Sequence, residues 1–273
     1  MEIYLPNCQD EEQALSSVTH LAIAAHQDDI EIMAYDGILK CFGQKNKNFA
    51  GVTVTNGRGS PRSGIYASYT DEQMQEVRKR EQKKAAFIGE YSAQIFLDHL
   101  SSNVKNPDDE NVVADFKTII QKTKPDYIYT HNLADKHDTH VGVALKVIKA
   151  LRELSYIPKA VFGCEVWRNL DWMQDDDKVK FDASGHGNLE AALLGVFDSQ
   201  IAGGKRYDLA TSGRRIANAT FSESHSVDIS TSLSYAMDLT PLAADKTLEV
   251  GRFVLQYINN FSKDVLNKLE ALQ

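Results

Sequence analysis

The chain of 273 residues is 42% hydrophobic and 25% charged, the balance of an ordinary globular protein that can bury a sizeable core. Its formal net charge is −8 and its basic residues form no long run, which disfavours nucleic acid or an anionic membrane surface as the main partner. There is no apolar run of ~18 residues and no signal-peptide pattern at the start, and the cysteines Cys8, Cys41 and Cys164 lack CxxC spacing. We therefore expect reduced thiols and a cytoplasmic protein without a membrane span.

Strand and helix patterns alternate through the first 155 residues. Short apolar runs predict strands at 20–25, 49–55, 94–100 and 126–130. Apolar residues at helical spacing predict helices at 32–42, at 112–120 and from about 138 to 151, and a capping box of Thr70 with Gln73 opens another helix through about Phe87. This order predicts an α/β, Rossmann-like three-layer fold with a mostly parallel sheet and helices on both faces.

The second half of the chain continues the pattern less regularly. It contains predicted strands at 159–167 and 178–184 and a predicted helix at 188–197. Apolar residues from Leu248 to Leu269 recur at helical spacing and predict one or two long amphipathic helices, which could pack on the domain or form an interface between copies. Because no linker interrupts the chain, we expect a single domain over 1–273, with its core at about 18–230 and a helical extension at 231–273.

Two short polar segments stand directly after predicted strands. The first is AAHQDDIE (24–31), and the second is THNLADKHDTH (130–140). Open parallel sheets bind ligands beyond the carboxyl ends of their strands, so both segments are expected at the same sheet edge.

The residues in these segments suit a metal-dependent hydrolase. His26 and Asp29 of the first segment and His140 of the second offer two imidazoles and one carboxylate, the ligand set of an open catalytic zinc site. Nitrogen and oxygen ligands also permit iron, manganese or cobalt. Asp28 is a candidate general base, and His137 a candidate to stabilise an oxyanion or protonate a leaving amine, with Asp135 or Asp138 to orient it.

Other interpretations stay open at this point. Asp28, Asp29 or Asp138 could simply cap the following helix. The same metal site could cleave an ester or a phosphoester, although the extra carboxylates of a two-metal phosphatase are not evident. A non-catalytic sugar- or nucleotide-binding module is the rival of another class, but the glycine-rich stretch GRGSPRSG fails the G-x-G-x-x-G pattern at Arg62.

At these two segments the sequence resembles the LmbE-like, or PIG-L, family of metal-dependent deacetylases. AHQDDIE is similar to the family's AHPDDE motif, and HNLADKHDTH to its HNxxDxHxxH-like motif. The resemblance implies that His26, Asp29 and His140 bind zinc, that Asp28 is the general base and that His137 is the charged partner of the tetrahedral intermediate. It also implies a small-molecule substrate, an N-acetylated amino sugar of the N-acetylglucosamine type. A homo-oligomer is left open.

The resemblance covers about residues 18–230 and includes further short matches. TNGRG (55–59) resembles the family's TxGExG loop, Arg78 with Glu81 its RxxE pair, and DSQI (198–201) a later serine–glutamine stretch. Arg78 is implied to contact the substrate. Two residues depart from the pattern: Gln27 stands in a proline position and Arg58 in a glutamate position, reversing a charge near the expected mouth of the site.

Several other residues have two interpretations. The loop from Gly57 to Tyr69 fits a solvated surface loop as well as a lid over the substrate. Trp167, Arg168 and Trp172 fit a sugar-stacking surface as well as the core. Arg214, Arg215 and His225 fall in a stretch that family members fold back over the site.

Overall fold

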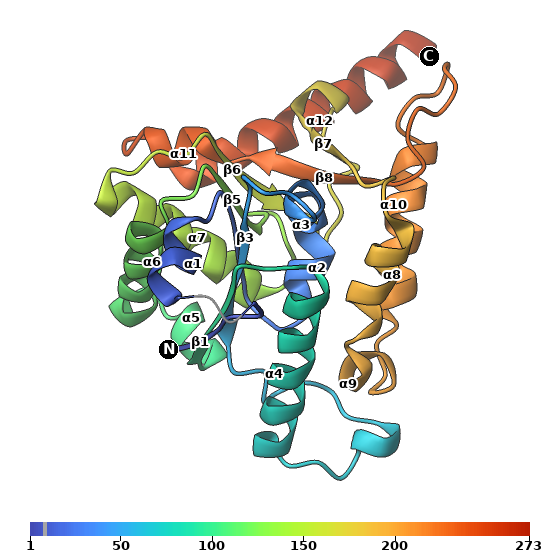
Figure 1. The fold of residues 1–273 in the computed structure, drawn as a ribbon. Coiled ribbons are helices and arrows are strands. Elements are labelled where there is room, and N and C mark those ends of the chain that lie inside the picture. The colour runs from blue at the N-terminus through green and yellow to red at the C-terminus, as the bar shows by residue number, and fades with distance from the viewer. Residues whose placement is uncertain (8–9) are drawn as a thin grey trace.

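A computed structural model describes residues 1–7 and 10–273, so the expectation for Cys8 lies outside the described residues. An eight-stranded sheet runs through the middle of the molecule in the order β1-β4-β3-β2-β5-β6-β8-β7 (Figure 1). The five strands from β4 to β6 in this order are parallel, whereas β1, β8 and β7 join antiparallel. The strands are β1 Glu2–Tyr4, β2 His20–Ala24, β3 Phe49–Thr55, β4 Ala93–His99, β5 Tyr127–His131, β6 Ala160–Cys164, β7 Val179–Asp182 and β8 Leu233–Asp238.

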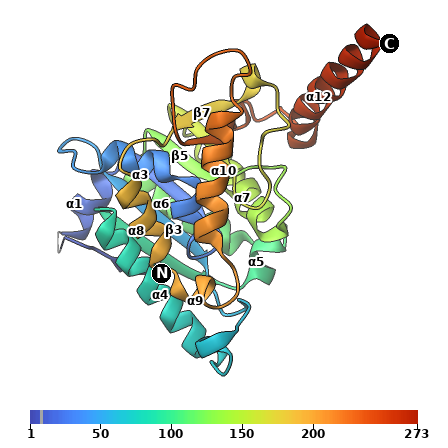
Figure 2. The same cartoon turned by 90° about the vertical axis from the view of Figure 1, so that its right-hand side faces the viewer.

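Helices cover both faces of this sheet (Figure 2). They are α1 Glu11–Ser16, α2 Asp29–Met33, α3 Tyr35–Cys41, α4 Asp71–Ile88, α5 Ser101–Lys105, α6 Glu110–Thr123, α7 Asp138–Leu154, α8 Gly187–Gly195, α9 Asp198–Ile201, α10 Tyr207–Thr220, α11 Thr240–Ala244 and α12 Val250–Leu272. One apolar core lies under α1, α6, α7 and α11, and a second lies under α2, α3, α4 and α8. Along β2, Leu21 and Ile23 enter the first core while Ala22 and Ala24 enter the second, because successive side chains point to opposite faces.

The order of the strands creates a switch point between β2 and β5. From β2 the chain moves outward through β3 and β4, and it then returns to the other side of β2 to form β5 and β6. The loops after β2 and β5 therefore diverge from one another at the carboxyl edge of the sheet, which opens a crevice where ligands bind in such folds. Both polar segments of the sequence lie in these two loops.

The predicted fold class is confirmed: the sheet is mostly parallel, helices lie on both faces and a helix ends the chain. The capping box is also present, since Thr70 Oγ1 accepts from the Gln73 backbone and Gln73 in turn accepts from the Thr70 backbone. The boundary expected at residue 231 is wrong for β8, Leu233–Asp238, which pairs with both β6 and β7 inside the sheet. The short strand β1 likewise joins the sheet outside the expected core of 18–230.

Helix α12 begins against the body of the molecule and then extends away from it (Figures 1 and 2). Phe253 is buried in the first core, and the backbone carbonyl of Asn260 accepts from Gln174 Nε2 at 3.2 Å. Past this point the apolar side chains of Val265 and Leu269 are exposed. In the described part of the chain, no helix is both long and apolar enough to cross a membrane.

Candidate metal centre

The loop after β2 turns sharply into α2 and buries its carboxylates. Asp28 has φ of 89°, a conformation that non-glycine residues rarely adopt. Its backbone N–H donates to the Gln82 side chain at 3.2 Å, which helps to hold the turn. Because of this turn, His26, Asp28 and Asp29 all line one cavity instead of alternating along an extended chain.

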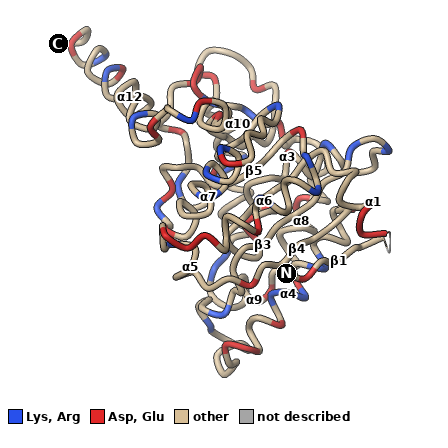
Figure 3. Tube along the Cα trace, turned by 90° about the vertical axis from the view of Figure 1, so that its left-hand side faces the viewer, with Lys and Arg blue, Asp and Glu red and all other residues tan. Residues whose placement is uncertain are grey.

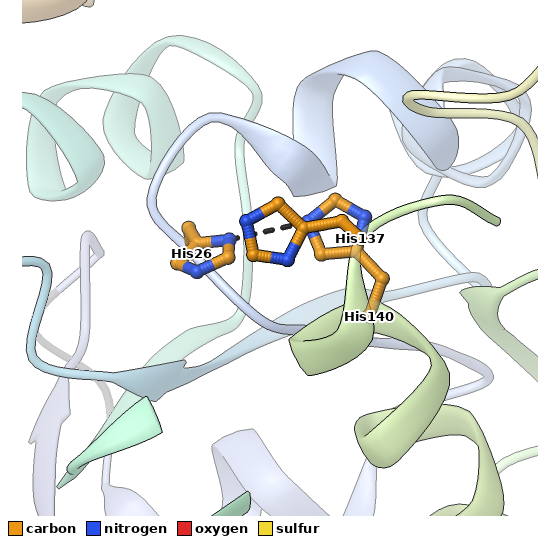
Figure 4. Close-up of side chains that lie close together, drawn as sticks. All are labelled: His26, His137 and His140. Atoms are coloured by element: carbon orange, nitrogen blue, oxygen red, sulfur yellow. Dashed lines mark hydrogen bonds between the residues drawn. The ribbon is translucent and has the colours of Figure 1, made fainter. Parts of the chain in front are cut away.

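The three predicted ligands, His26, Asp29 and His140, lie within hydrogen-bonding distance of one another. Nδ1 of His26 lies 3.2 Å from Oδ2 of Asp29 and 3.2 Å from Nε2 of His140, and the last two atoms are 3.3 Å apart. Four ligand atoms around a tetrahedral ion at about 2.0–2.1 Å would be separated from one another by about 3.3 Å. The triangle therefore fits one face of such a site. Figure 4 marks the contact between His26 and His140 with a dashed line.

The charges of this triangle favour a bound cation. Burial alone would lower the pKa of His140, but the carboxylates of Asp29 and Asp135 outweigh it and raise this pKa to about 9. Burial also opposes ionisation of Asp29, yet His140 and His26 hold its pKa well below its usual range. The site thus stabilises an anionic Asp29 beside a positive charge, which a divalent ion would supply in place of the His140 proton.

Asp135 contacts the ring nitrogen of His140 that points away from His26 and Asp29. Its Oδ2 lies 3.5 Å from Nδ1 of His140 and accepts from the Trp167 backbone at 3.1 Å. Carboxylates commonly orient a metal-binding histidine through its second ring nitrogen. The expectation that Asp135 orients the ring of His137 is wrong, because Asp135 contacts only the backbone N–H of that residue, at 3.0 Å.

His131 is a member of this cluster to which the sequence analysis gave no role. It ends β5, is fully buried and stacks on His140 with 3.9 Å between ring centroids. Its Nε2 accepts from the Ala25 backbone at 2.9 Å and lies 3.6 Å from Oδ2 of Asp29. Together with Asp29 and His140 it forms a second group with metal-binding geometry. Its place at the head of the HNLADKHDTH segment was the available sequence signal.

Asp28 lines the same cavity as His26 and Asp29, and one oxygen of its carboxylate has no hydrogen-bond partner. Its Oδ2 is buried without a hydrogen bond, and the guanidinium of Arg78 lies 3.8 Å away. Burial raises the pKa of Asp28 well above its usual range, although Arg78 opposes the shift. A carboxylate with a raised pKa is a stronger base, so this geometry suits proton abstraction.

His137 lines the cavity from the other loop. Its ring stacks on His140 at 4.6 Å and meets His26 edge-on at 5.0 Å, as Figure 4 shows. Its Nδ1 is buried without a partner. Burial, followed by the charge of His140, lowers the pKa of His137 and makes its imidazolium a stronger acid. His137 also forms a possible ligand group with His26 and His140.

Arg78 holds the segment AAHQDDIE (24–31) in place. We call this segment the metal loop, because it carries the candidate ligands His26 and Asp29. Arg78 is only 4% exposed, and its NH2 donates to the Gln27 backbone carbonyl at 2.7 Å. Its NH1 contacts Ser60 Oγ at 3.3 Å and the Gly57 carbonyl at 3.4 Å. Arg78 lines the cavity, but most of its donors are already used, so contact with a substrate stays a prediction.

Gln27, in the family's proline position, is fully buried. Its Nε2 donates to the Thr55 carbonyl at 3.3 Å and so joins the metal loop to the end of β3. Gly57 packs directly on this amide with φ of 73°, where a Cβ would collide with Gln27 Oε1. The side chain of Gln27 thus replaces the stiffness of a proline with packing between two loops.

The cavity has a volume of about 470 Å³, enough for a small molecule. Trp167, one of the two-way interpretations of the sequence, lines it, as do Gln200 of the DSQI stretch and two residues to which the sequence analysis gave no role, Lys205 and Tyr207. Trp167 lies 6.1 Å from His137 and 6.2 Å from Tyr207 between ring centroids, and so forms an aromatic wall. Trp172 instead packs against the first core, and Arg168 does not line the cavity.

The glycine-rich loop contributes to the cavity with its first half only. Gly57 to Pro61 line the cavity, whereas Ile65 is exposed to solvent. Arg62 fixes the loop by donating to the Tyr69 carbonyl at 2.8 Å and the Arg58 carbonyl at 2.7 Å. Tyr66 donates to Asp198 at 2.6 Å, which ties the loop to α9.

The later family-like residues have structural roles. Both oxygens of Glu81 accept from Ser199, at 2.7 Å from its backbone and 2.6 Å from its hydroxyl. Arg215 is buried and donates to the carbonyls of Glu31 and Ile32, at 3.0 and 2.9 Å. Neither it nor His225 lines the cavity, while Arg214 and Arg215 both line a smaller neighbouring pocket.

Comparisons with known proteins give a partial family match and a shared fold. The PIG-L family model, described as GlcNAc-PI de-N-acetylase, matches residues 21–151. N,N'-diacetylchitobiose deacetylase from Pyrococcus horikoshii aligns with a TM-score of 0.60 at 13% identity, covering 80% of this chain and 83% of that one. GalB, the 4-carboxy-2-hydroxymuconate hydratase from Pseudomonas putida KT2440, aligns at 0.59 with 15% identity, covering 81% and 96%. The zinc-inhibited form of teicoplanin deacetylase Orf2 aligns at 0.57 with 13% identity, covering 81% and 97%.

No curated protein sequence matches the chain at a significant level. The structural likenesses, all at low identity, establish the shared fold. The family match contains both polar segments, from the end of β2 to the start of α7. Over residues 21–151 the chain is similar to the PIG-L, or LmbE-like, family.

Proposed function

We propose that this chain is a metal-dependent hydrolase that removes the N-acetyl group from an amino sugar of the N-acetylglucosamine type. One observation carries the proposal: Asp28 and His137, each with an unpartnered buried atom, line the same cavity as His26 and Asp29, which contact the buried His140. A base and an acid on either side of a metal site are what amide hydrolysis needs. The fold alone does not choose the reaction, since the similar structures include a hydratase and deacetylases.

In this proposal the triangle of His26, Asp29 and His140 binds one divalent ion, zinc or alternatively iron, manganese or cobalt. When bound, such an ion lowers the pKa of a water toward ~7 and polarises a carbonyl. Asp28 takes a proton from the attacking water, whose oxygen bonds to the amide carbon. His137 stabilises the resulting oxyanion and then gives its proton to the nitrogen as the C–N bond breaks. The products are the free amine and acetate.

The cavity wall suits a sugar. Trp167 and Tyr207 provide apolar aromatic faces, and Asn56, Ser60 and Gln200 provide hydrogen-bonding groups around them. A ring with both C–H faces and hydroxyls is recognised by this combination of groups. We therefore expect the sugar to contact the aromatic wall of Trp167 and Tyr207, the polar groups around it and, by the family resemblance, Arg78.

The Asp28→Asn variant tests the proposal. Purified protein is assayed for amine release from N-acetylglucosamine and N,N'-diacetylchitobiose, with bound metal measured in the same samples. We expect the variant to keep its metal while amine release falls by about 10²–10⁴-fold, the usual contribution of a general base. Asp176→Asn is the matched control, because Asp176 is an exposed carboxylate that does not line the cavity. Wild-type protein that releases no amine but cleaves p-nitrophenyl acetate would instead favour the esterase.

A further inference from the structure

The mouth of the cavity is basic although the protein is acidic. The net charge of the chain is −8, and residues of both charges are spread along the whole trace (Figure 3). Among the residues that line the cavity, however, four are cationic: Arg58, Arg78, Lys105 and Lys205. Only Asp28 and Asp29 are acidic, and both belong to the buried metal loop.

The cations come from three separate parts of the chain. Arg58 follows β3, Lys105 is the last residue of α5, and Lys205 lies between α9 and α10. The fold brings these segments around one opening, so their gathering does not reflect a basic run in the sequence. We call Arg58, Lys105 and Lys205 the basic rim. Arg78 is excluded because it lies deeper and holds the metal loop.

The basic rim has charge available for a ligand. Within the described residues, neither Lys105 nor Lys205 has a carboxylate within 4.0 Å. Arg58 has one, Glu72 at 3.4 Å, whose side chain is 69% exposed. Such an exposed pair is weak and exchanges easily with a competing anion.

Lys205 is also held in position. Its ammonium lies 5.1 Å from the centroid of the Trp167 ring, so the aromatic wall carries a positive charge at its edge. Lys105 is exposed and has no hydrogen-bond partner among the side chains described. A ligand that stacks on Trp167 would therefore place a neighbouring substituent near a lysine.

We infer that the substrate is an anionic N-acetylated amino sugar, whose phosphate or carboxylate group is bound by the basic rim while its acetamide reaches the metal centre. This inference rests on the proposed deacetylation. Cations of one sign around a cleft with low-dielectric walls focus the field and attract an oppositely charged ligand. A glutamate at position 58, as in the family pattern, would repel the same group.

The direct test compares substrates that differ in charge. Amine release is measured at low ionic strength for N-acetylglucosamine, N-acetylglucosamine 1-phosphate, N-acetylglucosamine 6-phosphate and N-acetylmuramic acid. We expect kcat/KM for at least one anionic sugar to exceed that for the neutral sugar tenfold or more, and to fall as salt is added. Preference for either phosphate or for the carboxylate identifies which oxyanion is bound.

Variants assign the preference to the basic rim. In Lys105→Ala/Lys205→Ala and in Arg58→Glu, the ratio of kcat/KM for the anionic sugar to that for the neutral sugar is expected to fall about tenfold. Lys45→Ala/Lys47→Ala is the charge-matched control, since both lysines lie in the loop before β3, at the opposite sheet edge. A preferred neutral sugar, or an anion preference that survives the rim variants, would overturn the inference.

A binding measurement keeps this test separate from the deacetylase proposal. Glucosamine 6-phosphate, glucosamine 1-phosphate, muramic acid and glucosamine are titrated calorimetrically into wild type and Lys105→Ala/Lys205→Ala, with no turnover required. Tighter binding of a phosphorylated or carboxylated sugar that weakens in the variant supports the basic rim even if no amine is ever released. Equal binding of charged and neutral sugars would overturn it even if deacetylation is demonstrated.

Discussion

At the scale of single residues, Glu31 shows how much polarity the metal loop buries. It has no exposed surface, and one carboxylate oxygen accepts from Gln82 at 2.8 Å and from Tyr91 at 2.7 Å. The other oxygen is buried without a partner. Burial raises the pKa of Glu31 to about 8, although both hydrogen bonds oppose the shift. Glu31 is thus protonated at neutral pH and acts as a neutral hydrogen-bonding group.

This pKa predicts a loss of stability at alkaline pH. The pKa of Glu31 in the folded protein lies above its ordinary value of 4.5, so folding favours the protonated form. The stabilising contribution is fully present below about pH 4.5 and is lost as pH rises through about 8. Glu31→Gln keeps an acceptor for Gln82 and Tyr91 but cannot ionise. Urea unfolding between pH 5 and 9 should show a smaller loss of free energy of unfolding in this variant than in wild type. Parallel pH profiles for the two proteins would contradict the assignment.

The residues of the metal centre divide into those that the sequence could indicate and those that it could not. His26, Asp29 and His140 stand in two compact segments that follow strands, so strand position and ligand chemistry together predicted that they would meet. Lys205 and Tyr207 could not be found this way. They lie between α9 and α10 or at the start of α10, and their approach to the cavity depends on how these helices pack, which local spacing does not encode.

At the scale of elements, the contact of α4 with α9 connects the glycine-rich loop to the cavity wall. Glu81 on α4 is nearly buried, and both of its oxygens accept from Ser199 on α9. Tyr66 of the loop donates to Asp198, the neighbouring residue of α9. The orientation of α9 therefore depends on a small polar cluster and not on an apolar interface.

Ser199→Ala should weaken the contact between α4 and α9. The change leaves one oxygen of buried Glu81 without its hydroxyl donor, which costs about 1–3 kcal/mol of unfolding free energy. Because Gln200 and Lys205 line the cavity beside α9, KM for the amide substrate should also rise. Urea unfolding and steady-state kinetics measure the two effects. Ser16→Ala on exposed α1 is the control, and a Ser199→Ala protein as stable as that control would contradict the role of the cluster.

Elements with strong local signals were predicted accurately, while elements defined by distant pairing were not. The strand β3 and the helix α4 follow directly from an apolar run and a capping box. The strand β8 instead pairs with β6 and β7, more than 50 residues earlier in the chain, and its segment was expected to be helical. Helix α10 was missed because its buried residues include Thr211, Arg215 and Asn218, which do not form an apolar stripe.

At the scale of the whole molecule, topology explains why the two polar segments meet. They are about 100 residues apart in sequence, yet β2 and β5 are hydrogen-bonded neighbours, with Ala22 opposite Tyr129. The reversal of strand order between them opens the crevice in which the candidate metal ligands lie. We propose that the described residues act as one domain with α12 as its extension, since the sheet includes strands from β1 near the start to β8 near the end.

The measurement that tests the central claim most directly is bound metal in single-ligand variants. Wild type, His26→Ala, Asp29→Ala and His140→Ala are purified identically and analysed for divalent metal by mass spectrometry, with circular dichroism to verify folding. We predict about one ion per chain in wild type and at least a tenfold loss in each folded variant, while Asp28→Asn keeps its ion. Full metal content in a folded His140→Ala protein, or no metal in wild type after supplementation with zinc, iron, manganese or cobalt, would contradict the account.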